Sequence, residues 1–124
     1  MGIRQEQVAE LLRRHMSIVI QQEGQYIFGA APLVTVMNVI MTPDLGLAKF
    51  YFSIYNTDNK QAVMLELESA KPQLKQSLYR RIKNHIRRMP EIDFYDDNTI
   101  DEMEQVESLF KRLRADRQMG QEEE

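Results

Sequence analysis

The sequence predicts a single α+β domain in which a three-stranded sheet carries helices on one face. Two observations support this fold class. Apolar residues recur at helical spacing near both ends of the chain and in its middle, and the runs between residues 33 and 55 have the pattern of strands. The length of 124 residues, with 43% hydrophobic and 28% charged residues, suits one modest core. We assign it to residues 1–114 and expect the polar residues 115–124 to form a disordered tail.

The first predicted element is an amphipathic helix over residues 4–22. Its apolar stripe contains Val8, Leu11, Leu12, His15, Met16 and Val19. We expect His15 on this stripe to be a core histidine, whereas Arg13 and Arg14 fall outside the stripe. A loop over residues 24–32, marked by glycine and proline, should lead to the first strand.

A β-hairpin should follow. Its first strand, Leu33 to Met41, is nearly continuous in apolar and β-branched residues. Its second strand alternates between Ala48, Phe50, Phe52, Ile54 and Lys49, Tyr51, Ser53, Tyr55. This alternation predicts that the first set is buried and the second faces water. At the corner, Pro43 presets the turn, Asp44 can accept hydrogen bonds from nearby backbone N–H groups, and Gly46 permits a left-handed conformation.

The next predicted element is a short helix over residues 62–67. The polar residues 56–59 supply candidate N-caps for it. Within this group, Asp58 could form a capping box with Gln61.

A helix interruption is predicted at Ala70, Lys71 and Pro72. Pro72 lacks a backbone N–H and disfavours helical geometry at Lys71, so the helix should break there. A second helix should then start with Pro72 in its first turn and end before Pro90. Its apolar positions share one sector and are Leu74, Leu78, Ile82, Ile86 and Met89.

A third strand over residues 92–95 and a last helix over residues 99–113 complete the domain. Thr99 and Glu102 would form the capping box of that helix. The element order is α-β-β-α-(kink)-α-β-α, which is the order of a type II KH domain, a fold that binds single-stranded nucleic acid. The Gly-x-x-Gly loop with which ordinary KH domains clamp an RNA backbone is absent from the sequence.

The charge distribution indicates an anionic partner despite a net charge of −3. Residues 71–88 contain seven Lys or Arg and no acid. On the predicted helix, Arg80, Lys83 and Arg87 lie opposite the apolar sector, and Arg81 and Arg88 flank it. Lys71 and Lys75 lie near that sector and would have to extend their ammonium groups to water. Such a block can hold phosphates even in an acidic chain.

Residues 91–107 contain eight acids and no base. A metal site formed by Asp93, Asp96, Asp97 and Asp101 is one interpretation. However, these residues lie along a predicted strand and around a helix N-terminus, where the helix dipole favours negative charge, and EF-hand spacing is absent. We therefore expect no metal and no other cofactor.

Composition disfavours several other classes of function. The chain has no cysteine, which excludes disulfides, thiolate zinc sites and a cysteine nucleophile. No apolar run approaches the roughly 18 residues of a membrane span, and the first residues lack the apolar core of a secretory signal. We expect a soluble cytoplasmic protein. The two histidines suggest no Ser-His-acid site, and a phosphate-binding glycine-rich loop is absent, so no enzymatic activity is predicted.

Three motifs resemble those of one family. The hairpin corner reads Pro43-Asp44-Leu45 and is followed by Ala48 and an alternating strand that ends at Ser53. The third strand begins Pro90-Glu91-Ile92-Asp93-Phe94, and the first helix carries Val8-Ala9-Glu10-Leu11-Leu12, then basic residues and Ser17-Ile18. In this order and spacing, over about residues 4–113, they resemble the bacterial ribosome-binding factor A family. The chain departs from the family at Ala70-Lys71-Pro72, where the family has Ala-x-Gly.

The resemblance implies a non-enzymatic factor that binds the free, immature 30S subunit and assists late maturation of 16S rRNA. It implies contact with folded RNA through basic helix surfaces and no small-molecule substrate. The proposed contacts are Arg80, Arg81, Lys83, Arg87 and Arg88, with Lys71, Lys75, Arg13 and Arg14 as a second tier. We expect a monomer, since the chain shows no heptad seam.

Three alternatives remain open from the sequence. The basic block could be a solvated face that balances the acidic segment. The acidic segment and the last helix could instead make the chain a protein-interaction adaptor, and a small hydrolase is the third possibility. In addition, Tyr51 and Tyr55 could stack on bases if they face water.

Overall fold

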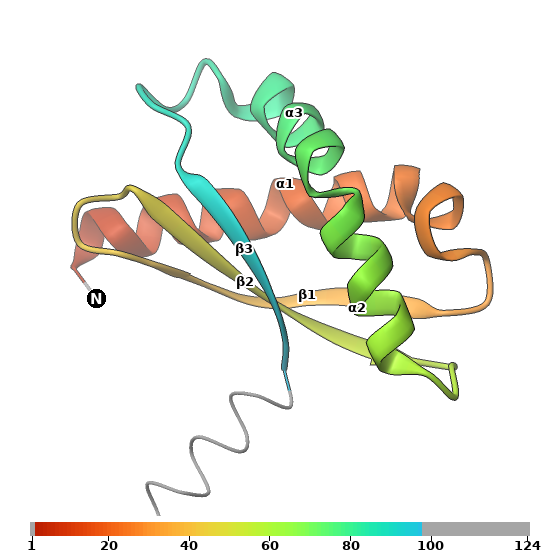
Figure 1. The fold of residues 1–124 in the computed structure, drawn as a ribbon. Helices are drawn as coiled ribbons and strands as arrows, with labels where there is room; N and C mark the ends of the chain where they lie inside the picture. The colour runs from red at the N-terminus through yellow and green to blue at the C-terminus, as the bar shows by residue number, and fades with distance from the viewer. Residues whose placement is uncertain (1, 98–124) are drawn as a thin grey trace, which may run out of the picture.

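The computed structural model describes residues 2–97 and has the predicted α+β, KH-like architecture (Figure 1). The elements are α1 (Ile3–Phe28), β1 (Leu33–Met41), β2 (Leu47–Tyr55), α2 (Lys60–Ser69), α3 (Lys71–Ile82) and β3 (Glu91–Asp96). This order confirms the interruption between the two middle helices. The predicted last helix over 99–113, its capping box at Thr99 and Glu102, and the tail 115–124 lie outside the described residues.

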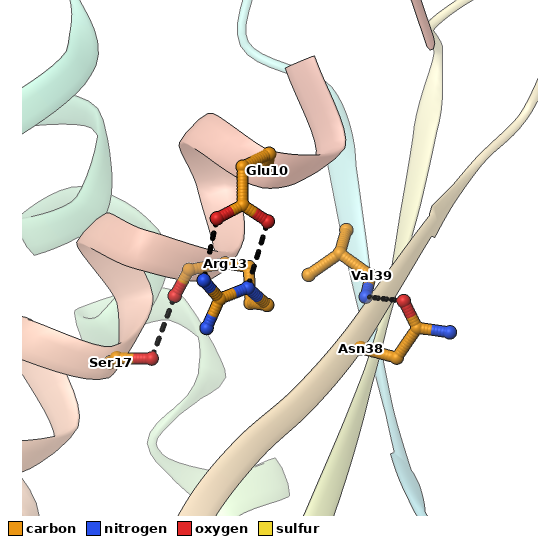
Figure 2. Close-up of polar contacts among 5 residues, drawn as sticks. All are labelled: Glu10, Arg13, Ser17, Asn38 and Val39. Carbon is orange, nitrogen blue, oxygen red and sulfur yellow. Dashed lines mark hydrogen bonds and ion pairs between the residues drawn. The ribbon is translucent and has the colours of Figure 1, made fainter. Parts of the chain in front are cut away.

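The three strands form a mixed sheet in the order β1-β2-β3. The central strand, β2, is antiparallel to β1 and parallel to β3, so α2 and α3 form the crossover between β2 and β3. A bulge shifts the register of β1 between Val36 and Asn38. The Asn38 side-chain oxygen accepts from the Val39 backbone N–H at 2.9 Å, which satisfies a donor beside the bulge (Figure 2).

The hydrophobic core lies between the sheet and the helices. Phe50 and Phe52 of β2 point into it, and the Phe94 ring of β3 meets both edge to face at centroid distances of 6.0 and 5.1 Å. The helices contribute side chains with no exposed surface, namely Leu12, Met16, Leu67, Leu74, Leu78 and Ile82. One cluster therefore joins α1, α2 and α3 to the same face of the sheet.

The first helix is longer than predicted and ends at Phe28 instead of near residue 22. Gly24 does not end it, because this glycine lies buried on the core side of α1. A Cβ at residue 24 would come within 2.5 Å of the Phe28 ring, so glycine allows that ring to pack against the helix. The residue that ends the helix is Gly29, which has φ 92° and ψ 174°.

The second middle helix is shorter than predicted and ends at Ile82 instead of Met89. After it, the His85 N–H donates to the Ile82 carbonyl at 2.8 Å, which turns the chain toward β3. Ile86 and Met89 still pack partly against the core, but from this turn-rich segment. Arg87 therefore does not share a helical pole with Arg80.

The second face of β2 is not exposed as the alternation predicted. Tyr51 and Ser53 are buried, although they lie on the opposite side of β2 from Phe50 and Phe52. The Tyr51 ring stacks on Tyr95 of β3 at a centroid distance of 5.3 Å, and burial raises the pKa of Tyr51. Only Tyr55, at the strand end, matches the prediction fully, with 60% of its surface exposed.

The structure corrects two predictions, one at the hairpin corner and one at the start of α2. At the hairpin corner the residue with positive φ is Leu45 (59°), whereas Gly46 is not in the left-handed region. The N-cap of α2 is Asn59, whose side chain accepts from the Ala62 N–H at 3.0 Å, so the capping box predicted at Asp58 is wrong. The acceptor role of Asp44 is confirmed by a 3.0 Å bond from the Gly46 N–H.

Candidate nucleic-acid interface

Antiparallel packing of α1 and α3 brings distant basic residues together. Toward the end of α1, the Gln73 amide donates to the Glu23 carboxylate at 2.9 Å. In the middle of α1, Arg81 contacts His15, 66 residues away in the chain. The segment after α3 then runs back toward the start of α1 (Figure 1). Basic residues that are far apart in the sequence are thus brought close where α1 meets α3 and the segment after it.

His15 lies between these two helices and is half-buried, so it is not the core histidine that the sequence predicted. The Arg81 Nε–H donates to His15 Nδ1 at 3.2 Å, and the His85 ring stacks near it at 6.4 Å between centroids. Burial, followed by the positive charges of Arg81, His85 and Arg14, lowers the pKa of His15. The neutral imidazole, with Nδ1 as acceptor, is therefore favoured.

The predicted contacts fall into exposed and internally paired groups. We define the basic surface as seven exposed cationic residues of α1, of α3 and of the segment after α3, namely Arg4, Arg14, Arg80, Arg81, Lys83, Arg87 and Arg88. Within residues 2–97, none of these makes an ion pair, and only Arg81 donates a side-chain hydrogen bond, to His15. Their charges face solvent, as phosphate recognition requires.

Arg4 is the member of this surface that sequence analysis missed. It lies in the first turn of α1, outside the basic block, and its exposed side chain lines the same pocket as Arg87 and Arg88. Tertiary packing brings these positions, more than eighty residues apart in the sequence, to one pocket, and no local pattern indicates this.

Lys71 and Lys75 are paired within the fold and do not belong to the basic surface. The Lys71 ammonium lies 2.9 Å from Glu68 and 3.4 Å from Asp93, and 5.7 Å from the centroid of the Phe94 ring. Its bond to Glu68 is the main reason that the pKa of Lys71 is raised. Lys75 lies 3.0 Å from Glu91 at the start of β3. These pairs connect the α2–α3 region to β3.

Arg13 is likewise paired, one turn from its partner on α1 (Figure 2). Its guanidinium donates two hydrogen bonds to the Glu10 carboxylate. In one of them, Arg13 Nε lies 2.9 Å from Glu10 Oε2. This fork lowers the pKa of Glu10 and leaves Arg13 less available than Arg14 for an external anion.

A pocket of about 460 Å³ lies where the segment after α3 meets α1 and the β1–β2 hairpin. We call it the Arg88 pocket. Its lining consists of Arg4, Val8, Asp44, Leu45, Ile86, Arg87, Arg88 and Pro90. Hydrogen bonds from Thr42 and Gly46, aided by the charge of Arg88, lower the pKa of Asp44. The pocket therefore combines three cations, one carboxylate and an apolar wall.

Other candidate chemistry finds little support in the described part of the chain. Residues 2–97 contain no group of three or more His, Asp or Glu side chains placed to hold a metal ion. Of the four acids considered for a metal site, Asp93 pairs with Lys71, and Asp101 lies outside the described residues. Tyr51 is buried and cannot offer its face to a base, whereas Tyr55 is exposed with Lys60 5.8 Å from its ring centroid. Among the helices of residues 2–97, none has the length and apolarity needed to cross a membrane.

Known proteins resemble this chain over most of its length. Ribosome-binding factor A of Chlorobium phaeobacteroides is 34% identical over 119 residues, covering 95% of this chain and 100% of the relative. The same factor of Chlorobaculum parvum is 36% identical over 115 residues, covering 92% and 93%.

Solved structures agree in fold. The crystal structure of ribosome-binding factor A from Thermus thermophilus superposes with a TM-score of 0.62 at 22% identity, over 77% of this chain and 97% of that one. A Thermus thermophilus homology model fitted into a cryo-EM map of a 30S complex of the factor gives a TM-score of 0.55 at 24% identity, over 68% and 86%. Finally, the family model described as ribosome-binding factor A matches residues 4–110. The chain therefore belongs to the ribosome-binding factor A family.

Proposed function

We propose that this chain binds the free, immature small ribosomal subunit and assists late maturation of 16S rRNA without catalysing a reaction. The observation that carries the proposal is the basic surface, whose exposed cations come from α1, α3 and the segment after α3; Arg81 contacts His15 of α1, and Arg4, Arg87 and Arg88 line one pocket. Membership of a family named for ribosome binding supports the small ribosomal subunit as the partner of this surface. The protein would act as a cytoplasmic monomer, with residues 1–114 as the binding domain.

Binding alone can assist maturation. If the basic surface contacts phosphates that lie closer together in the immature RNA than in the mature RNA, binding stabilises the immature arrangement until processing is complete. Release follows when the two conformations no longer differ in affinity. Since the sequence has no Gly-x-x-Gly loop, recognition would depend on the shape of folded RNA and not on a clamped single strand.

The test is charge reversal at Arg80, Lys83 and Arg87 together. All three side chains are exposed, so the triple variant should fold while losing affinity for small subunits in a sedimentation assay. The matched control is Lys60→Glu, which reverses an exposed charge at the start of α2, away from the basic surface. Unchanged subunit affinity in a folded triple variant would refute the assignment.

Nuclease treatment separates this proposal from the adaptor alternative. If the partner is ribosomal RNA, association with subunits should disappear once the RNA is digested. An association that persists would instead point to a protein partner.

A further inference from the structure

The Arg88 pocket combines arginines with a carboxylate and apolar side chains, whereas a surface that binds only phosphate needs cations alone. Arg4, Arg87 and Arg88 contribute guanidinium groups, and within residues 2–97 none of them is paired with an acid. The lining also includes apolar side chains, among them Leu45 and Ile86, which we call the apolar wall. The volume of about 460 Å³ lies within the range of roughly 300–1,000 Å³ that is typical of small-molecule sites.

Asp44 is held in a fixed orientation in this pocket. The Thr42 hydroxyl donates to Asp44 Oδ1 at 2.7 Å, and the Gly46 N–H donates to the same oxygen at 3.0 Å. Both bonds use Oδ1, which leaves Oδ2 as an acceptor for an external donor. A carboxylate beside three cations would weaken the binding of a bare phosphate, so it suits a ligand that carries an anion at one end and an N–H donor at the other.

We propose that the Arg88 pocket binds the nucleoside monophosphate unit of one unpaired RNA residue. The guanidinium groups of Arg4, Arg87 and Arg88 hold the phosphate through charge-assisted hydrogen bonds. The apolar wall packs against the ribose and the base, and Asp44 Oδ2 accepts from an exocyclic amino group. Adenine, cytosine and guanine carry such a group, whereas the ring N3–H of uracil lies between two carbonyl oxygens that repel a carboxylate, so the pocket disfavours uridine. This inference rests on the proposed RNA-binding function.

The first experiment titrates the isotopically labelled full chain with AMP, CMP, GMP and UMP at millimolar concentrations and follows the backbone amide signals. We expect shifts at Leu45, Arg87 and Arg88, with UMP the weakest nucleotide. Adenosine and orthophosphate, which each carry only part of the ligand, should bind more weakly than AMP. Equal binding of orthophosphate and AMP, or the absence of shifts at these residues, would overturn the proposal.

Variants test the assigned roles. Arg4→Gln and Arg88→Gln should each weaken AMP binding about tenfold, as expected for loss of a charge-assisted hydrogen bond. Lys60→Gln, which removes an exposed charge outside both the pocket and the basic surface, is the control and should bind AMP normally. Asp44→Asn replaces the acceptor by an amide that can donate, so the preference should change in favour of UMP. An unchanged base preference in Asp44→Asn would contradict the role of Asp44.

Two further experiments test whether the bound nucleotide belongs to RNA and whether the pocket inference and the proposed function fail separately. A short single-stranded RNA that binds at least tenfold more tightly than AMP supports an RNA ligand, whereas equal affinity points to a free nucleotide and contradicts the RNA assignment. If small subunits bind the wild type and the Arg4→Gln/Arg88→Gln variant equally, the pocket inference fails while the proposed function stands. If the wild type binds RNA in the pocket but not subunits, the proposed function fails instead.

Discussion

Lys71 connects three elements through one side chain. Its ammonium pairs with Glu68 of α2 and with Asp93 of β3, and it lies near the Phe94 ring. With 27% of its side chain exposed, it is partly shielded from water, which strengthens these contacts relative to a surface pair. We infer that Lys71 stabilises the fold, although the sequence placed it in the second tier of RNA contacts.

The substitution Lys71→Gln should lower the free energy of unfolding by about 1 kcal/mol, because it removes two ion pairs and a cation–π contact. Urea denaturation measures this change. Lys60→Gln is the control, since Lys60 is exposed, lies near the Tyr55 ring and makes no ion pair within residues 2–97. Subunit affinity should be unaffected; normal stability with impaired subunit binding would instead identify Lys71 as an RNA contact.

His15 makes the stability of the domain depend on pH. Burial and the charges of Arg81, His85 and Arg14 lower the pKa of His15 in the folded state, so below the ordinary histidine value the unfolded chain binds more protons. Stability should therefore fall as the pH is lowered through that value and level off below the folded-state pKa. Protonation of Nδ1 would also remove the bond from Arg81.

We expect wild type to lose more stability than His15→Gln between about pH 7.5 and about pH 5.5, which lie on either side of the ordinary histidine pKa of about 6.5. Urea denaturation at the two pH values measures the difference. Parallel losses in the two proteins would show that His15 is not responsible.

The helix boundaries depend on packing as much as on local signals. α2 and α3 share Ala70 as their cap, and Leu67 and Leu74, on either side of the break, are fully buried. Pro72 lies in the first turn of α3, where its missing N–H costs little. Proline therefore takes the place of the family's glycine without loss of the interruption.

The end of α1 provides a test at the scale of one element. Gly29 has φ 92° and ψ 174°, a region that only glycine adopts readily, so Gly29→Ala should reduce the free energy of unfolding by about 1–3 kcal/mol. Nothing lies within 4 Å of the added Cβ, so any loss comes from backbone strain and not from a clash. Ala30→Gly, in the same loop, is the control and should cost under about 1 kcal/mol. Equal losses in the two variants would exclude a special conformation at residue 29.

At the scale of the whole molecule, the fold of residues 2–97 divides the cations predicted as RNA contacts, together with Arg4, into two groups. Lys71, Lys75 and Arg13 are used in internal ion pairs, whereas the basic surface keeps its charges toward solvent. A net charge of −3 therefore coexists with a locally positive edge.

Salt dependence of subunit binding should reveal this division. Removing a side chain that contacts a phosphate reduces the slope of log affinity against log salt by about 0.7–0.9. We expect such a reduction for Arg80→Gln and for Arg87→Gln, and no reduction for Arg13→Gln, which is paired with Glu10. An equal reduction for Arg13→Gln would show that internal pairing does not decide which arginines meet RNA.

Much of the fold follows from local patterns. The bounds of β1, the break at Ala70 and the hydrogen bond from a backbone N–H to Asp44 were all predicted, because a run of apolar and β-branched residues, proline geometry and short side-chain bonds act over a few residues. The end of α3 and the burial of Tyr51 were missed. The burial of Tyr51 depends on the neighbouring strand β3, and the end of α3 depends on the path of the chain to β3. Neither can be deduced from a few consecutive residues.

For the site, the sequence identified the kind of residue and the tertiary structure decided its use. The basic block was visible as uninterrupted positive charge, but pairing of Lys71 with Asp93 and the approach of Arg4 to Arg88 depend on elements distant in the chain. The strength of an ion pair depends on distance and solvent exposure, and both are set only when the helices pack on the sheet.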